Sequence, residues 1–95
     1  MPIMYFDIRW PDASESHCYS PSVVIKDYLV PGRSYPLTDF LARTTEALNV
    51  ASERVRAKFG FTCASALDQL GQIERLAAQF SSNPNAQVLV LAFYE

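Results

Sequence analysis

The sequence predicts an α+β fold, a two-layer sandwich in which an α-helical hairpin covers a small antiparallel sheet. Three observations lead to this prediction. Apolar and polar residues alternate near the start of the chain, two long middle stretches carry apolar residues at helical spacing, and the last stretch is continuously apolar. The expected order of elements is β-β-α-α-α-β, with a β-hairpin and a C-terminal strand forming the sheet.

The composition is that of one folded domain spanning residues 1–95. Of the 95 residues, 49% are hydrophobic and 19% are charged, which supplies enough apolar surface to offset the entropy lost on folding. No apolar run is long enough to cross a membrane, and no signal-peptide pattern follows Met1. With only two cysteines, the chain is expected to be cytoplasmic and to have no membrane partner. The net charge of -2 argues against nucleic acid as a partner.

The N-terminal stretch predicts a β-hairpin. Its side chains alternate between an apolar set (Met4, Phe6, Ile8 and Trp10) and a more polar set (Tyr5, Asp7 and Arg9). Residues 11–14 have turn chemistry, and residues 15–19 are expected to return as a short polar strand at the sheet edge.

A short helix is expected over residues 21–29. Ser20 is placed to cap it, and Pro21 suits the first helical position. The β-branched run at residues 23–25 favours a strand instead, so both alternatives stay open there. Residues 31–32 (PG) end this element, and residues 33–35 are expected to form a connecting loop.

Two long helices are expected next, one over residues 36–59 and one from Thr62 to about residue 80. The buried stripe of the first contains Leu37, Phe40, Leu41, Thr44, Leu48, Ala51 and Val55. The stripe of the second contains Cys63, Ala66, Leu67, Leu70, Ile73, Ala77 and Phe80. Gly60 is expected to end the first helix in the left-handed conformation, with Phe61 folding back on the last turn.

The last stretch, residues 87–94, predicts a strand that is apolar on both faces. One face would hold Val88, Val90 and Ala92, and the other Leu89, Leu91 and Phe93. Only one set can face the helices, so the other is expected to meet a second copy of the protein in a homodimer formed through the sheet. The alternative is that the short helix or the N-terminal residues cover it.

Several runs of the chain resemble one small bacterial family, the nitrogen starvation response family. They are IRWPD (8–12), CYSPS (18–22), DYL with PG (27–29 and 31–32), SYPL (34–37), DF (39–40), ASERVRAK (51–58), GFxC (60–63) and ALDQL (66–70). The resemblance covers residues 8–73. It implies an accessory product of a gene cluster built around a nitrilase, induced when nitrogen is scarce and located in the cytoplasm. The family supplies no catalytic residue to carry over.

The two cysteines and the single histidine are candidate chemical groups. Cys63 would lie in the first turn of the second helix, where backbone N–H groups favour a thiolate, but it also falls on the buried stripe, and packing is the favoured interpretation. His17 and Cys18 would point to opposite faces of their strand. A metal site there would need further ligands such as Asp7, so a solvated histidine is favoured.

Tyr5, Asp7 and Arg9 share one face of the first strand. If that face is exposed, they form a polar patch suited to a partner or a small anion. The simpler interpretation is the ordinary solvated face of an antiparallel sheet.

No phosphate loop, dinucleotide fingerprint or metalloprotease motif is present, and we expect no cofactor and no bound metal. The leading hypothesis is a non-enzymatic accessory or regulatory protein of a nitrogen-linked pathway, which binds another protein of the nitrilase-linked cluster or a metabolite. The alternative is a small cysteine-dependent enzyme, or a thiol or metal sensor, with a site near Cys63 or Cys18.

Overall fold

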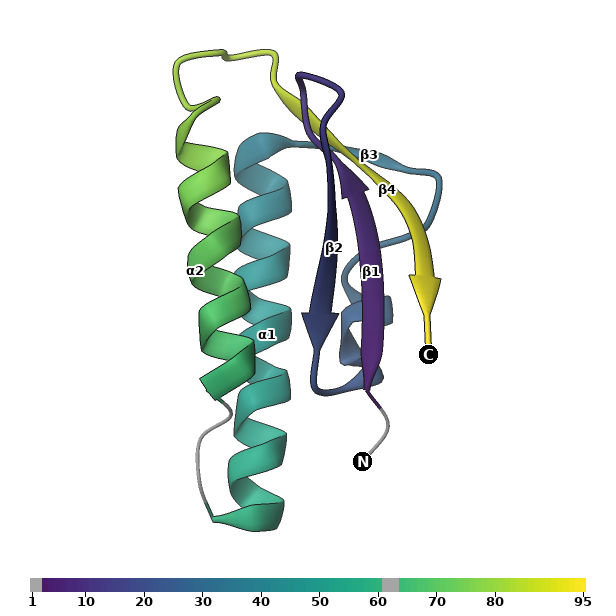
Figure 1. The fold of residues 1–95 in the computed structure, drawn as a ribbon, viewed down its shortest axis with the longest axis vertical. Coiled ribbons are helices and arrows are strands. Elements are labelled where there is room, and N and C mark those ends of the chain that lie inside the picture. The colour runs from purple at the N-terminus through teal and green to yellow at the C-terminus, as the bar shows by residue number, and fades with distance from the viewer. Residues whose placement is uncertain (1–2, 61–63) are drawn as a thin grey trace.

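A four-stranded antiparallel sheet and two long helices form two layers in the computed structural model, which describes residues 3–60 and 64–95 (Figure 1). The elements are β1 (Met4–Arg9), β2 (Glu15–Ser20), the 3-10 helix η1 (Val23–Asp27), β3 (Ser34–Pro36), α1 (Leu37–Phe59), α2 (Ala64–Ala78) and β4 (Gln87–Tyr94). The strand order is β2-β1-β4-β3. Both helices lie on the same side of the sheet, so the predicted α+β two-layer sandwich is confirmed.

The hairpin of β1 and β2 and the strand β4 form where the sequence predicts them. Because side chains alternate along a strand, Met4, Phe6 and Ile8 of β1 all point toward the helices and are buried. Trp10 continues this buried set, and its Nε1 donates a hydrogen bond to Ser16 Oγ at 2.8 Å.

The sheet contains a strand that the sequence analysis missed. Residues 34–35 were expected in a connecting loop and Pro36 at the start of the long helix, but Ser34–Pro36 forms β3 and pairs with the start of β4, and the helix begins at Leu37. Three residues are too few to show a two-residue periodicity. Pro36 is tolerated because β3 is an edge strand, where a backbone N–H is not needed for the sheet.

The short helix is smaller than predicted and begins later. Residues 21–29 contain only the 3-10 helix Val23–Asp27, and the cap is Ser22 rather than Ser20. The Ser22 side chain accepts a hydrogen bond from the Val24 backbone N–H. Ser20 is instead the last residue of β2, and its hydroxyl donates to the Ser22 carbonyl oxygen at 2.7 Å.

The predicted stripe of α1 faces the sheet, with only Leu41 partly exposed. Gly60 ends the helix at φ 80, as predicted, and its N–H donates to the Arg56 carbonyl oxygen at 2.8 Å. Three expectations fall outside the described residues: the contact of Phe61, the start of the second helix at Thr62 and the position of Cys63 in its first turn.

The buried stripe of α2 was predicted too wide, and the helix was predicted too long. Leu67 is 48% exposed, although it was assigned to the buried stripe. The helix ends at Ala78, because Gln79 and Phe80 hydrogen bond three residues back, to Leu76 and Ala77, and so tighten the last turn. Phe80 still packs on the core, stacked on Trp10 with ring centroids 5.9 Å apart.

A bulge in β4 changes which of its residues face the helices. Ile8 pairs with Val90 but Asp7 pairs with Ala92, so Leu91 is skipped in the register. Beyond the bulge, Phe93 lies on the helix side and packs on the core, while Ala92 lies on the other side. The predicted division into two strictly alternating sets is therefore wrong after Val90.

Within the residues that the structure describes, no helix combines the length and apolar character needed to span a bilayer.

Candidate functional site

The face of the sheet turned away from the helices is the open face, and it carries most of the candidate residues. Three cross-strand rows make it up. They are Tyr19–Tyr5–Tyr94, His17–Asp7–Ala92 and Glu15–Arg9–Leu89, each running over β2, β1 and β4. The predicted patch of Tyr5, Asp7 and Arg9 therefore lies in the middle of this face, on the central strand β1.

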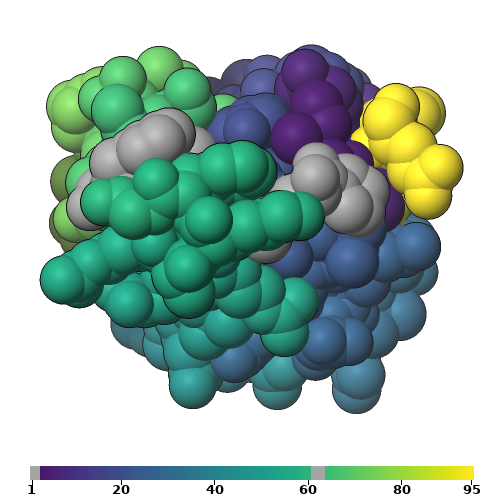
Figure 2. Space-filling model, turned by 90° about the horizontal axis from the view of Figure 1, so that it is seen from below, coloured from purple at the N-terminus to yellow at the C-terminus, as the bar shows by residue number. Residues whose placement is uncertain are grey.

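Four rings gather at one end of the open face, and we call Tyr5, His17, Tyr19 and Tyr94 the aromatic cluster. His17 stacks on Tyr5, with ring centroids 5.0 Å apart and an interplanar angle of 12°. Tyr19 contacts Tyr5 at 5.9 Å, and Tyr94 contacts His17 at 6.1 Å. Tyr94 is 49% exposed. Figure 2 shows the C-terminal residues in yellow at the molecular surface, across the molecule from α2.

Asp7 fixes the ring of His17. The two residues are direct cross-strand partners, and Asp7 Oδ1 is hydrogen bonded to His17 Nδ1. The Asp7 side chain is the more enclosed of the two, because its exposed fraction is 26% against 59% for His17. The hydrogen bond and the stacked Tyr5 ring together hold the imidazole in one orientation.

Arg9 forms an ion pair with Glu15 at the other end of the open face, at 3.1 Å. Both side chains are about half exposed, so the ion pair adds little to the stability of the fold. It places one positive and one negative charge side by side on the open face. Among residues 3–60 and 64–95, no group of three histidine, cysteine or acidic side chains is placed to hold a metal ion.

Cys18 lies on the opposite face from its neighbour His17, as the strand geometry predicted. It is 1% exposed and belongs to the core under the helices. Burial and, to a smaller extent, the nearby Asp7 carboxylate together raise the pKa of the Cys18 thiol to about 12. The thiol is thus protonated at neutral pH, which weighs against a nucleophilic role for it. Cys63 is outside the described residues.

Tyrosine and tryptophan are enriched in interaction surfaces, and the sequence has six such residues: Tyr5, Trp10, Tyr19, Tyr28, Tyr35 and Tyr94. Two of them are core residues instead. Trp10 is 2% and Tyr35 is 4% exposed, and the Tyr35 hydroxyl accepts a hydrogen bond from the Val30 N–H at 3.0 Å. The contacts of Tyr19 with Tyr5 and of Tyr94 with His17 depend on the strand register, so the residue types alone could not reveal them.

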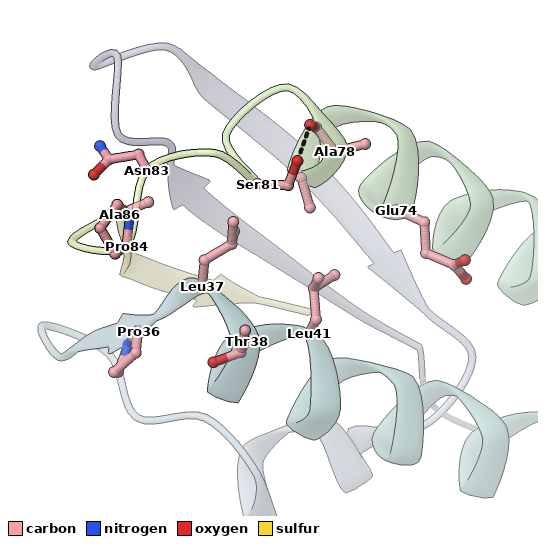
Figure 3. A pocket seen from close by; sticks show the side chains of 11 residues that line it. Pro36, Leu37, Thr38, Leu41, Glu74, Ala78, Ser81, Asn83, Pro84 and Ala86 are labelled. Carbon is pink, nitrogen blue, oxygen red and sulfur yellow. Dashed lines mark hydrogen bonds between the residues drawn. The ribbon is translucent and has the colours of Figure 1, made fainter.

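A second feature is a cavity of about 400 Å³ on the helix side of the molecule (Figure 3). It lies where the first turns of α1, the last turns of α2 and the loop between α2 and β4 meet. Nothing in the sequence pattern predicted it, because its lining residues come from α1, α2 and a loop that meet only in the folded chain.

The fold and the open face define a small α+β two-layer protein with an aromatic outer sheet surface. This chain belongs to the family of the nitrogen starvation-induced protein NitG, whose family model matches residues 5–93. The resemblance seen in residues 8–73 is thereby confirmed and extends over nearly the whole chain. No curated protein sequence and no solved structure is significantly similar to the chain.

Proposed function

We propose that this nitrogen starvation-induced protein is a non-enzymatic accessory protein that binds another protein through the open face of its sheet. The observation that carries this proposal is the aromatic cluster. Tyrosine is among the residues most enriched in protein interfaces, because it offers a large rigid ring together with a hydroxyl group. The Asp7–His17 and Arg9–Glu15 pairs supply polar contacts next to these rings.

The partner that we propose is another cytoplasmic protein of the nitrilase-linked cluster. Support for this part comes from the family, which is described as nitrogen starvation-induced, and we take induction under one condition as the reason to seek the partner among enzymes made under that condition. The open face offers half-exposed rings within a mixed polar surface, and this combination is typical of partners that associate and separate.

A second copy of the chain is the competing occupant of the open face. The homodimer was predicted because Leu89, Leu91 and Phe93 were expected to share the outer face of the sheet. The bulge in β4 weakens that argument, because it turns Phe93 toward the core. Leu89, Ala92 and Tyr94 still lie on the open face, so a homodimer through the sheet stays a prediction. The mass of the purified protein, measured by light scattering over a concentration series, distinguishes a monomer from a dimer.

The proposal is tested by affinity capture of the tagged protein from nitrogen-starved and nitrogen-replete cells, followed by mass spectrometry. The informative variant is Tyr94→Ser on the open face, and the matched control is Leu67→Ser on α2, which removes an equally exposed apolar side chain. We expect a stoichiometric partner in starved cells that Tyr94→Ser loses and Leu67→Ser keeps. A partner that both variants retain would show that the open face is not the binding surface.

The cysteine-based alternative has a direct test of its own. A reactive thiol with a pKa well below the usual range of about 8.5 would favour an enzyme or a thiol sensor. The burial of Cys18 argues against this role for that residue. A thiol titration of the wild-type protein and of Cys63→Ser therefore decides whether any reactive cysteine is present.

A further inference from the structure

The cavity between α1 and α2 lies away from the open face and needs an explanation of its own. Its lining comes from three segments: Pro36, Leu37, Thr38 and Leu41 near the start of α1, Glu74, Ala77 and Ala78 near the end of α2, and Ser81, Asn83, Pro84 and Ala86 in the following loop. Its volume of about 400 Å³ is near the lower end of the range for small-molecule pockets. The size therefore suits a ligand of few atoms.

The walls of the cavity are mostly apolar. Leu37, Ala77 and Ala86 are buried and line its inner part, and Leu41 is partly buried beside them. Apart from Glu74, α2 presents only the short side chains of Ala77 and Ala78, and the loop after it adds the short side chain of Ser81 (Figure 3). Water in such a hollow finds few hydrogen-bond partners, and an apolar group that displaces it is favoured.

Glu74 is the only charged side chain in the lining. It extends from α2 toward α1, at the end of the cavity opposite Asn83 and Pro84 (Figure 3). Within the described part of the chain its carboxylate forms no ion pair. An unpaired carboxylate at the edge of an apolar cavity repels anions and attracts a positively charged hydrogen-bond donor.

The hydroxyl group of Ser81 also favours a ligand that donates hydrogen bonds. It donates its hydrogen to the Ala78 carbonyl oxygen at 2.9 Å, so toward a ligand it can act only as an acceptor. Thr38 and Asn83 can both donate and accept. Beside the apolar walls, the Glu74 carboxylate and the Ser81 oxygen are the polar groups that can only accept, which matches a ligand that has an alkyl chain and a donor-bearing cationic end.

We propose that this cavity binds a small primary alkylammonium ion. The alkyl chain lies against Leu37, Leu41 and Ala77, and the ammonium group donates hydrogen bonds to the Glu74 carboxylate. This proposal does not depend on the function proposed for the open face, because the two surfaces share no residue.

Three probes with the same branched carbon skeleton test the proposal: 3-methylbutylammonium, 3-methylbutanol and 3-methylbutanoate. Each is titrated at constant pH and ionic strength into the isotope-labelled protein, and backbone amide shifts are followed by NMR. We expect saturable shifts centred on the segments that line the cavity. The ammonium ion should bind at least about fivefold more tightly than the alcohol, as expected for one charge-assisted hydrogen bond at a partly exposed site. The anionic probe, 3-methylbutanoate, should bind most weakly of the three.

Two substitutions separate the charge from the shape of the cavity. Glu74→Gln should remove the preference for the ammonium ion over the alcohol, while Glu46→Gln on exposed α1 surface should leave it unchanged. Ala78→Leu should fill the cavity and abolish binding of all three probes, while the exposed Ala42→Leu should not. Because Glu74 and Ala78 are exposed, both variants are expected to fold, and their amide spectra confirm it.

Several results would overturn the proposal. One is the lack of saturable shifts with any of the probes, and another is binding that Ala78→Leu leaves unchanged. Equal affinity for the ammonium ion and the alcohol, or tighter binding of the carboxylate, would refute the role of Glu74. None of these results bears on partner capture through Tyr94, so the two proposals fail separately.

Discussion

Asp7 and His17 face each other across β1 and β2, and the carboxylate of Asp7 holds the imidazole of His17 flat against the ring of Tyr5. This pair joins the charged part of the open face to its aromatic part. His17 contacts Tyr5 and Tyr94, which come from strands at opposite ends of the sequence. The orientation of one side chain therefore depends on the pairing of three strands.

The energetic coupling of Asp7 and His17 can be measured with a double-mutant cycle. We expect Asp7→Ala and His17→Ala each to lower the free energy of unfolding by less than about 1 kcal/mol, because the pair is partly exposed. The cycle should give a favourable coupling of about 0.5 kcal/mol, the usual size for a cross-strand pair. Urea denaturation of the four proteins measures it. Strictly additive effects would show that the hydrogen bond contributes nothing to stability.

The local parts of the fold could be predicted from the sequence. Alternation in β1 and the apolar stripe of α1 follow from residue order within one element, and both were found as expected. The strand β3 could not be predicted, since three residues carry no periodic signal and pair only because β4 lies beside them. The bulge at Leu91 was equally hidden, because it is a property of how β1 and β4 pair.

The same division applies to the candidate site. Tyr5, Asp7 and Arg9 were predicted to share a face, because this follows from alternation along one strand. The hairpin of β1 and β2 brings His17 opposite Asp7, and Asp7 was predicted as a possible neighbour of His17. The inclusion of Tyr94 depends on the shifted register of β4. The cavity depends on the packing of α1 against α2, which residue order does not reveal.

The buried thiol of Cys18 predicts a specific dependence of stability on pH. Its folded-state pKa of about 12 lies above the ordinary cysteine pKa of 9.0, so between these pH values the unfolded chain loses this proton while the folded chain keeps it. The stability that this group contributes is therefore complete below pH 9.0 and is lost as pH rises toward 12. In Cys18→Ala the fall of unfolding free energy above pH 9.0 should be shallower, by at most about 1.4 kcal/mol per pH unit.

This prediction is checked with urea denaturation of both proteins at matched pH values from 8 to about 11, because tyrosines and lysines titrate in both and cancel in the difference. Reactivity gives a second check. In a Cys63→Ser background, Cys18 should react with a thiol reagent only when denaturant is added. Rapid labelling of the native protein would contradict the burial of Cys18.

Substitution of Leu48 tests the core beneath the sheet. Leu48 is 1% exposed on the buried face of α1, so Leu48→Asp places a carboxylate where neither water nor a partner can reach it. We expect a loss of at least about 4 kcal/mol, enough to unfold a domain of this size. Asn49→Asp, one position along on the exposed side, introduces the same charge as a control. Circular dichroism should show the helical signal lost in the first variant and kept in the second.

Gly60 and Gly71 should respond in opposite directions to the same substitution. Gly60 has φ 80, where a side chain is strained even though no described residue places an atom within 4 Å of the Cβ position, so Gly60→Ala should cost about 1 kcal/mol. Gly71 lies inside α2 without a positive φ, and an added Cβ would meet only the flexible end of Arg75 at 3.4 Å. Gly71→Ala should therefore stabilise the protein by about 0.5–1 kcal/mol through its higher helix propensity. Thermal or urea unfolding of the two variants measures both values, and stabilisation by Gly60→Ala would contradict the left-handed end of α1.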